Sequence, residues 1–162
     1  MRARKQFGVE VMVSGSAREA VEGADVICTI TGARTPVLEG AWISPGAHVN
    51  AVGASLPTAR ELDTAAVERA RLFVDRREST LAEAGDFLIP RGEGAITDAH
   101  ILGELGDLLA KSVKGRVKRD DITLFKSLGL AVEDVAALRY IHGQAVAAGV
   151  GTRVALGGLR DG

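Results

Sequence analysis

The sequence predicts an α/β fold, in which a parallel sheet carries helices on both of its faces. Short apolar runs alternate with helix-like segments along the 162 residues, and this order is typical of strand–helix–strand units. The run from Val26 to Ile30 is apolar without a break, as expected for a strand buried on both faces of a parallel sheet. Hydrophobic residues make up 46% of the chain and charged residues 25%, which is an ordinary balance for a globular domain.

The first elements are short. Residues 1–6 have the composition of an exposed helix end, and Val9–Val13 alternate valines with other residues, which predicts a half-covered strand. Ser16 and Glu19 have the spacing of a capping box, in which the side chain of each residue accepts a hydrogen bond from the backbone N–H of the other. They predict a short helix that ends near Gly23.

The central part is expected to continue the alternation. The connection over 38–47 contains Trp42 as an anchor and Pro45-Gly46 as a turn. The elements expected after it are a strand over 48–52, a helix capped by Asp63 and running to about 70, a strand over 72–74 and a helix over 76–84. Asp98 is then expected to cap a helix that has four apolar residues on one face: Ile101, Leu105, Leu108 and Leu109.

The segment 122–137 is the most informative. An apolar strand over 122–125 runs into the polar pair Lys126 and Ser127, and a turn at Gly129 leads into an alanine-rich helix over 130–148. Open α/β sheets present side chains to ligands at such strand ends. Lys126 itself is interpreted as a solvated surface amine. The glycine-rich residues 149–162 are expected to form a flexible tail.

Composition excludes several classes of function. The net charge of −1 does not indicate a basic surface that would bind nucleic acid or an anionic membrane. The basic run over 111–119 lacks aromatic side chains on which bases could stack. No apolar run approaches the roughly 18 residues of a membrane span. Cys28 is the single cysteine, is expected to be buried as a small hydrophobe, and fits a reducing cytoplasm. The three histidines have no metal-ligand spacing, so no metal site is expected.

Six short pieces of sequence, taken in order, carry a resemblance to a known family. They are Ala24–Thr29, Pro45–Ala54, Arg60–Asp63, Glu83–Asp86, Gly103–Gly106 and Phe125–Gly129. Together they resemble the ornithine cyclodeaminase/mu-crystallin family of nicotinamide-dependent proteins, and the resemblance extends from about Val9 to Ala147. It implies a Rossmann-type domain whose last helix, 130–148, returns to a separate dimerisation and substrate domain.

One family feature is missing from the chain. The family carries a glycine-rich turn after its first strand, which holds the cofactor pyrophosphate, whereas Gly149-Val-Gly151 follows a helix instead. The resemblance therefore implies an incomplete Rossmann-type sheet without the first strand–glycine-rich turn–helix unit, with residues 1–148 as its carboxyl-terminal part. We interpret Met1 as an internal position of a longer product. The isolated chain is expected to be inactive and to bind the cofactor weakly or not at all. It is also expected to be poorly soluble, because the unpaired edge of the strand Val26–Ile30 invites aggregation.

The resemblance also assigns candidate ligand contacts. It implies that Thr31 and Gly32 line the dinucleotide, that Val52 contacts the nicotinamide, and that Ser127 binds its carboxamide. Glu83 matches a ligand-contacting glutamate of mu-crystallin-like members. From the residues alone, Thr31 and Gly32 could equally form an ordinary strand-to-loop turn, and Glu83 could be a solvated carboxylate on a helix.

Ser55 occupies the position at which cyclodeaminases and related alanine dehydrogenases have an aspartate. A neutral hydroxyl cannot act as a base near pH 7 without a partner. Together with this chemistry, the resemblance implies that the parent protein is an NADPH- or NADH-dependent oxidoreductase that reduces imines or ketimines to amino acids. It implies a cytoplasmic homodimer joined through the missing amino-terminal half. Two alternatives remain open: an ornithine cyclodeaminase, and a non-catalytic protein that binds NADPH or a small ligand.

Overall fold

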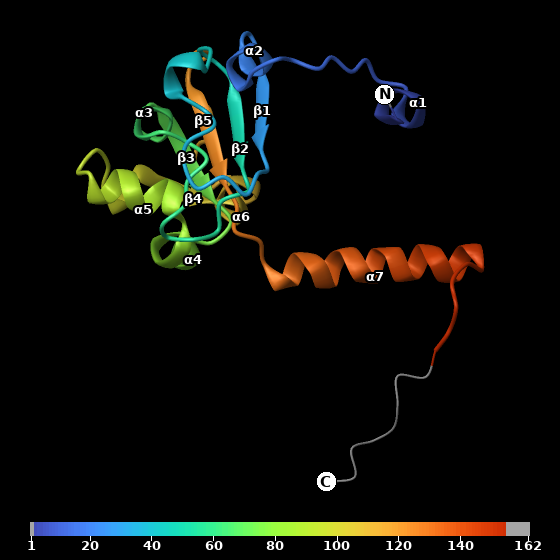
Figure 1. The fold of residues 1–162 in the computed structure, drawn as a ribbon. Coiled ribbons are helices and arrows are strands. Elements are labelled where there is room, and N and C mark those ends of the chain that lie inside the picture. The colour runs from blue at the N-terminus through green and yellow to red at the C-terminus, as the bar shows by residue number, and fades with distance from the viewer. Residues whose placement is uncertain (1, 155–162) are drawn as a thin grey trace. The chain divides into compact units, whose positions relative to one another are not determined.

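The computed structural model describes residues 2–154 of the chain (Figure 1). Two compact units are present, one over residues 1–128 and the other over residues 129–162. The first contains the sheet and all helices but one. The second contains the helix α7 (Ala131–Ala148), which the sequence predicts over 130–148.

The sheet has five strands, and all of them are parallel. Along the chain they are β1 (Val26–Thr29), β2 (His48–Ala51), β3 (Ala70–Val74), β4 (Ile101–Glu104) and β5 (Ile122–Lys126). Their order across the sheet is β1-β2-β5-β3-β4, so β5 is central and β1 is an edge strand. The predicted α/β class with a parallel sheet is confirmed. The bare edge expected for Val26–Ile30 is also present among the described residues.

Short helices connect and flank the strands. In chain order they are α1 (Arg2–Phe7), α2 (Ala17–Val21), η1 (Gly40–Trp42), α3 (Thr64–Glu68), α4 (Arg77–Glu83), α5 (Gly85–Gly92), η2 (Asp98–His100) and α6 (Leu105–Leu109). Two predicted caps are confirmed. The Ser16 hydroxyl accepts a hydrogen bond from the N–H of Glu19, and Asp63 Oδ1 accepts one from the N–H of Ala66.

The core lies on one face of the sheet, because alternate residues of each strand point to that face. It includes Ile27, Val49, Leu72, Val74 and Leu124, all of which are buried. This hydrophobic layer holds the strand ends in a fixed arrangement.

The other face of β1 corrects a prediction. Val26 is 60% exposed and Cys28 is exposed, so this strand is covered on one face only and Cys28 is not a buried hydrophobe. A continuous apolar run marks a doubly covered strand only where a second layer packs on it, and no described residue covers these two side chains.

Two further elements differ from the prediction. Residues 8–14 form no strand, because alternation makes a strand only where a neighbour accepts its backbone hydrogen bonds, and β1 has no strand on its outer side within residues 2–154. Residues 98–109 form η2, β4 and α6 in place of one helix. Pairing with β3 buries Ile101 and Gly103, and this tertiary contact overrides the helical spacing of the apolar residues.

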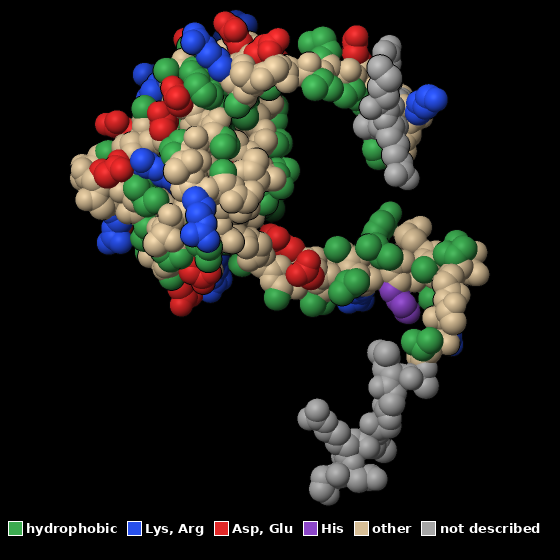
Figure 2. Space-filling model, viewed as in Figure 1, with side chains coloured by type: hydrophobic (Ala, Val, Ile, Leu, Met, Phe, Trp, Pro, Cys, Tyr) green, Lys and Arg blue, Asp and Glu red, His purple; other side chains and the backbone are tan. Residues whose placement is uncertain are grey.

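The helix α7 exposes apolar side chains along its length (Figure 2). The large ones that are more than half exposed are Val132, Val135, Leu138, Tyr140, Ile141 and Val146. Gly149 ends the helix with φ of 64°, a conformation that favours glycine. Residues 149–154 of the predicted tail have no regular structure, and residues 155–162 lie outside the described part. No helix within residues 2–154 has the length and hydropathy of a membrane span.

Gly40 in η1 lies so close to the backbone of α3 that no side chain fits there, and this yields a test of the packing. A Cβ at this position would lie 2.5 Å from the backbone N of Ala66, so Gly40→Ala must displace α3. We expect the substitution to lower the free energy of unfolding by about 1–3 kcal/mol in urea denaturation. Gly92→Ala is the matched control, since nothing lies within 4 Å of its added Cβ. Equal stability of the two variants would contradict the packing described.

Candidate functional site at the carboxyl ends of the strands

Three neighbouring strands bring the predicted cofactor-binding residues to one edge of the sheet. Thr31 and Gly32 follow β1, Val52 follows β2 and Ser127 follows β5. The strands are in register at this edge, where Thr29 pairs with Ala51 and Ala51 pairs with Lys126. Thr31, Gly32 and Val52 are exposed, and Ser127 is half-buried. The arrangement has the geometry that ligand sites of open α/β sheets share.

A buried glutamate joins the first two of these strand ends. Glu61 is fully buried, and its two carboxylate oxygens accept hydrogen bonds from the N–H of Thr31 (2.5 Å) and the N–H of Gly53 (2.9 Å). A Cβ on Gly53 would lie 2.3 Å from the backbone N and O of Thr31. Only glycine therefore allows the loops after β1 and β2 to approach each other this closely.

The surroundings of Glu61 keep it ionised. Burial by itself raises the pKa of this carboxyl, but the hydroxyls of Thr31 and Thr29 and the backbone N–H groups of Thr31 and Gly53 lower it more. The net pKa lies below the ordinary glutamate value. The site thus contains a fixed negative charge that is hidden from the surface.

Asp75 plays the same part for β3 and β5. It is buried directly after β3, and it accepts hydrogen bonds from the N–H of Arg76 (2.7 Å), the N–H of Leu128 (2.6 Å) and the hydroxyl of Ser127 (3.1 Å). The hydroxyl of Ser127 is therefore held in a defined position at the end of β5.

A buried ion pair completes the set, and it overturns the interpretation of Lys126 as a surface amine. Lys126 is 1% exposed, and its Nζ lies 3.1 Å from Oδ2 of Asp86 and donates to the carbonyl of Ala54 at 2.5 Å. Asp86 Oδ1 accepts from the N–H groups of Glu61 (2.8 Å) and Leu62 (3.0 Å). The side chain is buried because it extends from the core face of the central strand towards α5.

The remaining candidates lie on the surface. Ser55 is exposed in the loop after β2, and Glu83 is exposed at the last residue of α4, which lies near the carboxyl ends of the strands (Figure 1). His48 contacts Thr123 and Asn50, and His100 Nε2 contacts the carbonyl of Val67 at 2.8 Å. No group of three potential metal ligands occurs among the described residues.

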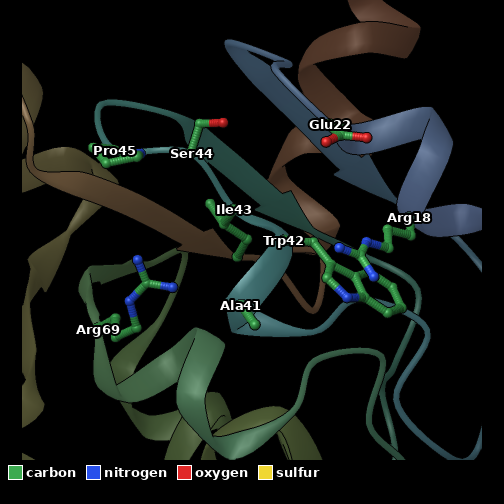
Figure 3. A pocket seen from close by; sticks show the side chains of 8 residues that line it. All are labelled: Arg18, Glu22, Ala41, Trp42, Ile43, Ser44, Pro45 and Arg69. Carbon is green, nitrogen blue, oxygen red and sulfur yellow. The ribbon is translucent and has the colours of Figure 1, made fainter.

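A cavity of about 360 Å³ lies away from this edge (Figure 3). Its lining includes Arg18, Trp42, Pro45 and Arg69, whose side chains are drawn in Figure 3. Pro45 precedes β2 and Arg69 precedes β3, so the cavity belongs to the amino ends of the strands. It contains none of the candidate residues and adds nothing to the site.

The sequence prediction missed Glu61, Asp75 and Asp86 as parts of this site. Two of them lie inside pieces that carry the family resemblance, Arg60–Asp63 and Glu83–Asp86, and Asp75 directly follows a predicted strand. The position of Asp75 directly after a predicted strand could have indicated a buried carboxylate, because backbone N–H groups at strand ends need hydrogen-bond acceptors.

Comparison with known proteins identifies several relatives. The model of the family described as "Ornithine cyclodeaminase/mu-crystallin family" matches residues 1–149. The ketimine reductase mu-crystallin of Mus musculus is 45% identical over 133 residues, which cover 82% of this chain and 40% of the mouse protein. The chain thus spans less than half the length of this relative.

Two solved structures share the fold. One is the Δ1-pyrroline-2-carboxylate reductase of Thermococcus litoralis in complex with NADH and L-proline, at a TM-score of 0.88 and 44% identity, covering 93% of this chain and 47% of that one. The other is an archaeal alanine dehydrogenase dimer with bound NAD, at a TM-score of 0.83 and 30% identity, covering 96% and 48% respectively.

Glu61→Gln tests the hydrogen bonds between the two loops. The amide group of glutamine directs a donor at one of two backbone N–H groups, so we expect a loss of about 2 kcal/mol in unfolding free energy at pH 7. The pKa of Glu61 is lower in the folded chain than in the unfolded chain, where it is about 4.3. The ionised side chain therefore contributes its full stabilisation of the fold above about pH 4.3, and this contribution is lost as the pH falls through the folded-state pKa.

Denaturation of both chains between pH 7 and pH 3 measures this effect. The stability difference should shrink at the acid end, because the wild type then loses its advantage. Glu68→Gln, on the exposed surface of α3, is the control and should change little. A difference that grows as the pH falls would contradict the assignment.

Proposed function

The chain belongs to the ornithine cyclodeaminase/mu-crystallin family, and from this premise we propose that it forms the nicotinamide-facing part of an NAD(P)H-dependent imine reductase. The substrate class would be cyclic or linear imines and ketimines, and the products amino acids. Two relatives support this choice, since one is named a ketimine reductase and the other reduces Δ1-pyrroline-2-carboxylate. The observation that carries the proposal is the shared edge of β1, β2 and β5, at which Thr31, Gly32, Val52 and Ser127 gather.

The residues at this edge fit a dinucleotide. The side chains of Thr31 and Val52 are small and exposed, and Gly32 has open space around its Cα. The carboxylates of Glu61, Asp75 and Asp86 are buried and bonded to donors, so their oxygens lie beneath the surface that a cofactor would contact. The nicotinamide, when bound, supplies the hydride for the imine carbon.

Each candidate then has a role in the proposed reaction. Val52 would lie against the nicotinamide and exclude water from it, and the hydroxyl of Ser127 would bind the carboxamide. The hydroxyl of Thr31, which accepts the N–H of Ala33 at 3.1 Å, would lie against the ribose or the nicotinamide and accept a further hydrogen bond from it. Glu83 would contact the substrate. Either NADPH or NADH is compatible with these contacts.

Ser55 favours a reductase over a deaminating cyclase. Its side chain is exposed beside the proposed nicotinamide position, yet a hydroxyl is a poor proton acceptor near pH 7. Reduction of an imine requires a hydride and little base chemistry, whereas deamination of ornithine requires an acid–base group at the reacting carbon.

We extend the proposal to organisation and assembly. Residues 1–148 would be the carboxyl-terminal part of a dinucleotide-binding domain with α7 as its returning helix, and residues 149–162 a tail. The exposed apolar side chains of α7 fit a helix that packs on another domain. A homodimer formed outside this segment agrees with the dimer of the archaeal alanine dehydrogenase. A cytoplasmic location agrees with a chain that has one cysteine.

A chimera tests the reaction. Residues 1–149 would replace the matching half of the Thermococcus litoralis reductase, which is 44% identical over the aligned region. We expect the chimera to oxidise NADH when Δ1-pyrroline-2-carboxylate is added, and to release no ammonia from ornithine. Ammonia release at a comparable rate would favour the cyclodeaminase. A folded chimera that binds NADH without turnover of either substrate would favour a non-catalytic binding protein.

Thr31→Val in the same chimera tests the cofactor contact. Loss of one neutral hydrogen bond of about 1 kcal/mol should raise the KM for NADH about five-fold and leave kcat less affected. Thr35→Val, an exposed threonine of the same loop, is the matched control and should leave both constants unchanged. Equal effects of the two substitutions would remove Thr31 from the proposed site.

A further inference from the structure

Lys126 is the one lysine with a buried ammonium group among the side chains that the structure describes from residue 5 onwards. It ends the central strand β5, and its Nζ has two partners on different elements. The carboxylate of Asp86 comes from the first turn of α5, and the carbonyl of Ala54 comes from the loop after β2. An ammonium group is costly to bury, and both partners are needed to offset that cost.

The loop that Lys126 contacts carries two candidate residues. Ala54 lies between Val52, the proposed nicotinamide contact, and Ser55, the proposed neutral replacement of an acid–base group. Two buried side chains hold the backbone of this loop. Glu61 accepts a hydrogen bond from the N–H of Gly53, and Lys126 donates one to the carbonyl of Ala54. Asp86 connects the two groups, since it binds Lys126 and the backbone N–H of Glu61.

We infer that Lys126 is a positioning residue, which fixes Val52–Ser55 through the carbonyl of Ala54 so that Val52 and Ser55 face the ligand. At 1% exposure its ammonium cannot reach a substrate, so it acts through the loop and not on the reacting atoms. The consequence for the reaction rests on the proposed function, whereas the ordering of the loop does not. The competing explanation is a purely structural ion pair with Asp86.

Two substitutions separate these explanations. Lys126→Met keeps the length of the side chain and removes both contacts. Asp86→Asn removes the ionic partner but retains Oδ1, which can still accept the N–H groups of Glu61 and Leu62. The double variant leaves no unpaired buried charge, so it should recover part of the stability that each single variant loses. Lys118→Met, at an exposed lysine, is the control.

The readout is the loop itself, measured by NMR amide exchange on the full 162-residue chain. We expect exchange at Val52 and Gly53 to rise about ten-fold in Lys126→Met and equally in the double variant. In Asp86→Asn, exchange should rise clearly less than in Lys126→Met, because the bond from Lys126 to Ala54 persists although the ionic partner is lost. The inference would be overturned if the double variant regained both stability and slow amide exchange at Val52 and Gly53. It would also be overturned if exchange in Asp86→Asn rose as much as in Lys126→Met. If Lys126→Met does not fold, Asp86→Asn and the double variant still decide between the two explanations.

A titration of the same samples with NADH addresses the consequence for the ligand. We expect weak binding by the wild type, with amide shifts at Val52, and an affinity several-fold lower in Lys126→Met and in the double variant than in Asp86→Asn. Equal affinities in all four chains would overturn the positioning role. If no chain responds to NADH, the same substitutions are compared in the chimera with the Thermococcus litoralis reductase, where equal KM values for NADH would overturn the positioning role and absence of turnover would count against the proposed function. The exchange data decide the role of Lys126 in the loop in either case.

Discussion

The carboxylate of Glu61 accepts hydrogen bonds from backbone N–H groups that follow two neighbouring parallel strands. Parallel strands end at the same edge, where the regular hydrogen bonding of the sheet stops, and the N–H of Gly53 there also donates to the carbonyl of Thr29 at 3.2 Å. A side-chain carboxylate with two acceptor oxygens satisfies one group from each loop and holds the loops together. Gly53 permits the approach, because any side chain at that position would collide with Thr31. The candidate site depends on this contact, since Thr31 and Val52 flank it.

Asp75 and Asp86 accept hydrogen bonds in the same way along this edge, so buried carboxylates hold the ends of β1, β2, β3 and β5. The charge of Asp86 is paired with that of Lys126, and Asp75 accepts hydrogen bonds from backbone N–H groups and from the hydroxyl of Ser127. The exposed surface above them is thereby left to small neutral side chains. The buried network is connected to the proposed dinucleotide site because it fixes the loops that a cofactor would contact.

Local pattern predicted much of the fold. The strands that contain Val49, Leu72 and Leu124 and the cap at Asp63 required only neighbouring residues to recognise. Pattern failed where distant residues decide. Ile101 pairs with β3 in place of forming a helix, Cys28 is exposed because nothing described covers it, and Lys126 is buried because Asp86 and Ala54 meet it. The family resemblance implied Thr31, Val52 and Ser127 as residues that follow strands, whereas the carboxylates beneath them depend on contacts between residues as far apart as Asp75 and Leu128.

The most direct test of this account is an NMR pH titration of the full chain that follows the Glu61 carboxyl carbon and the amide protons of Thr31 and Gly53 together. We expect all three signals to titrate as one transition with a midpoint below the ordinary glutamate pKa, because the two N–H groups stabilise the carboxylate. A midpoint above the ordinary value, or amide protons that do not respond when the carboxyl titrates, would contradict it.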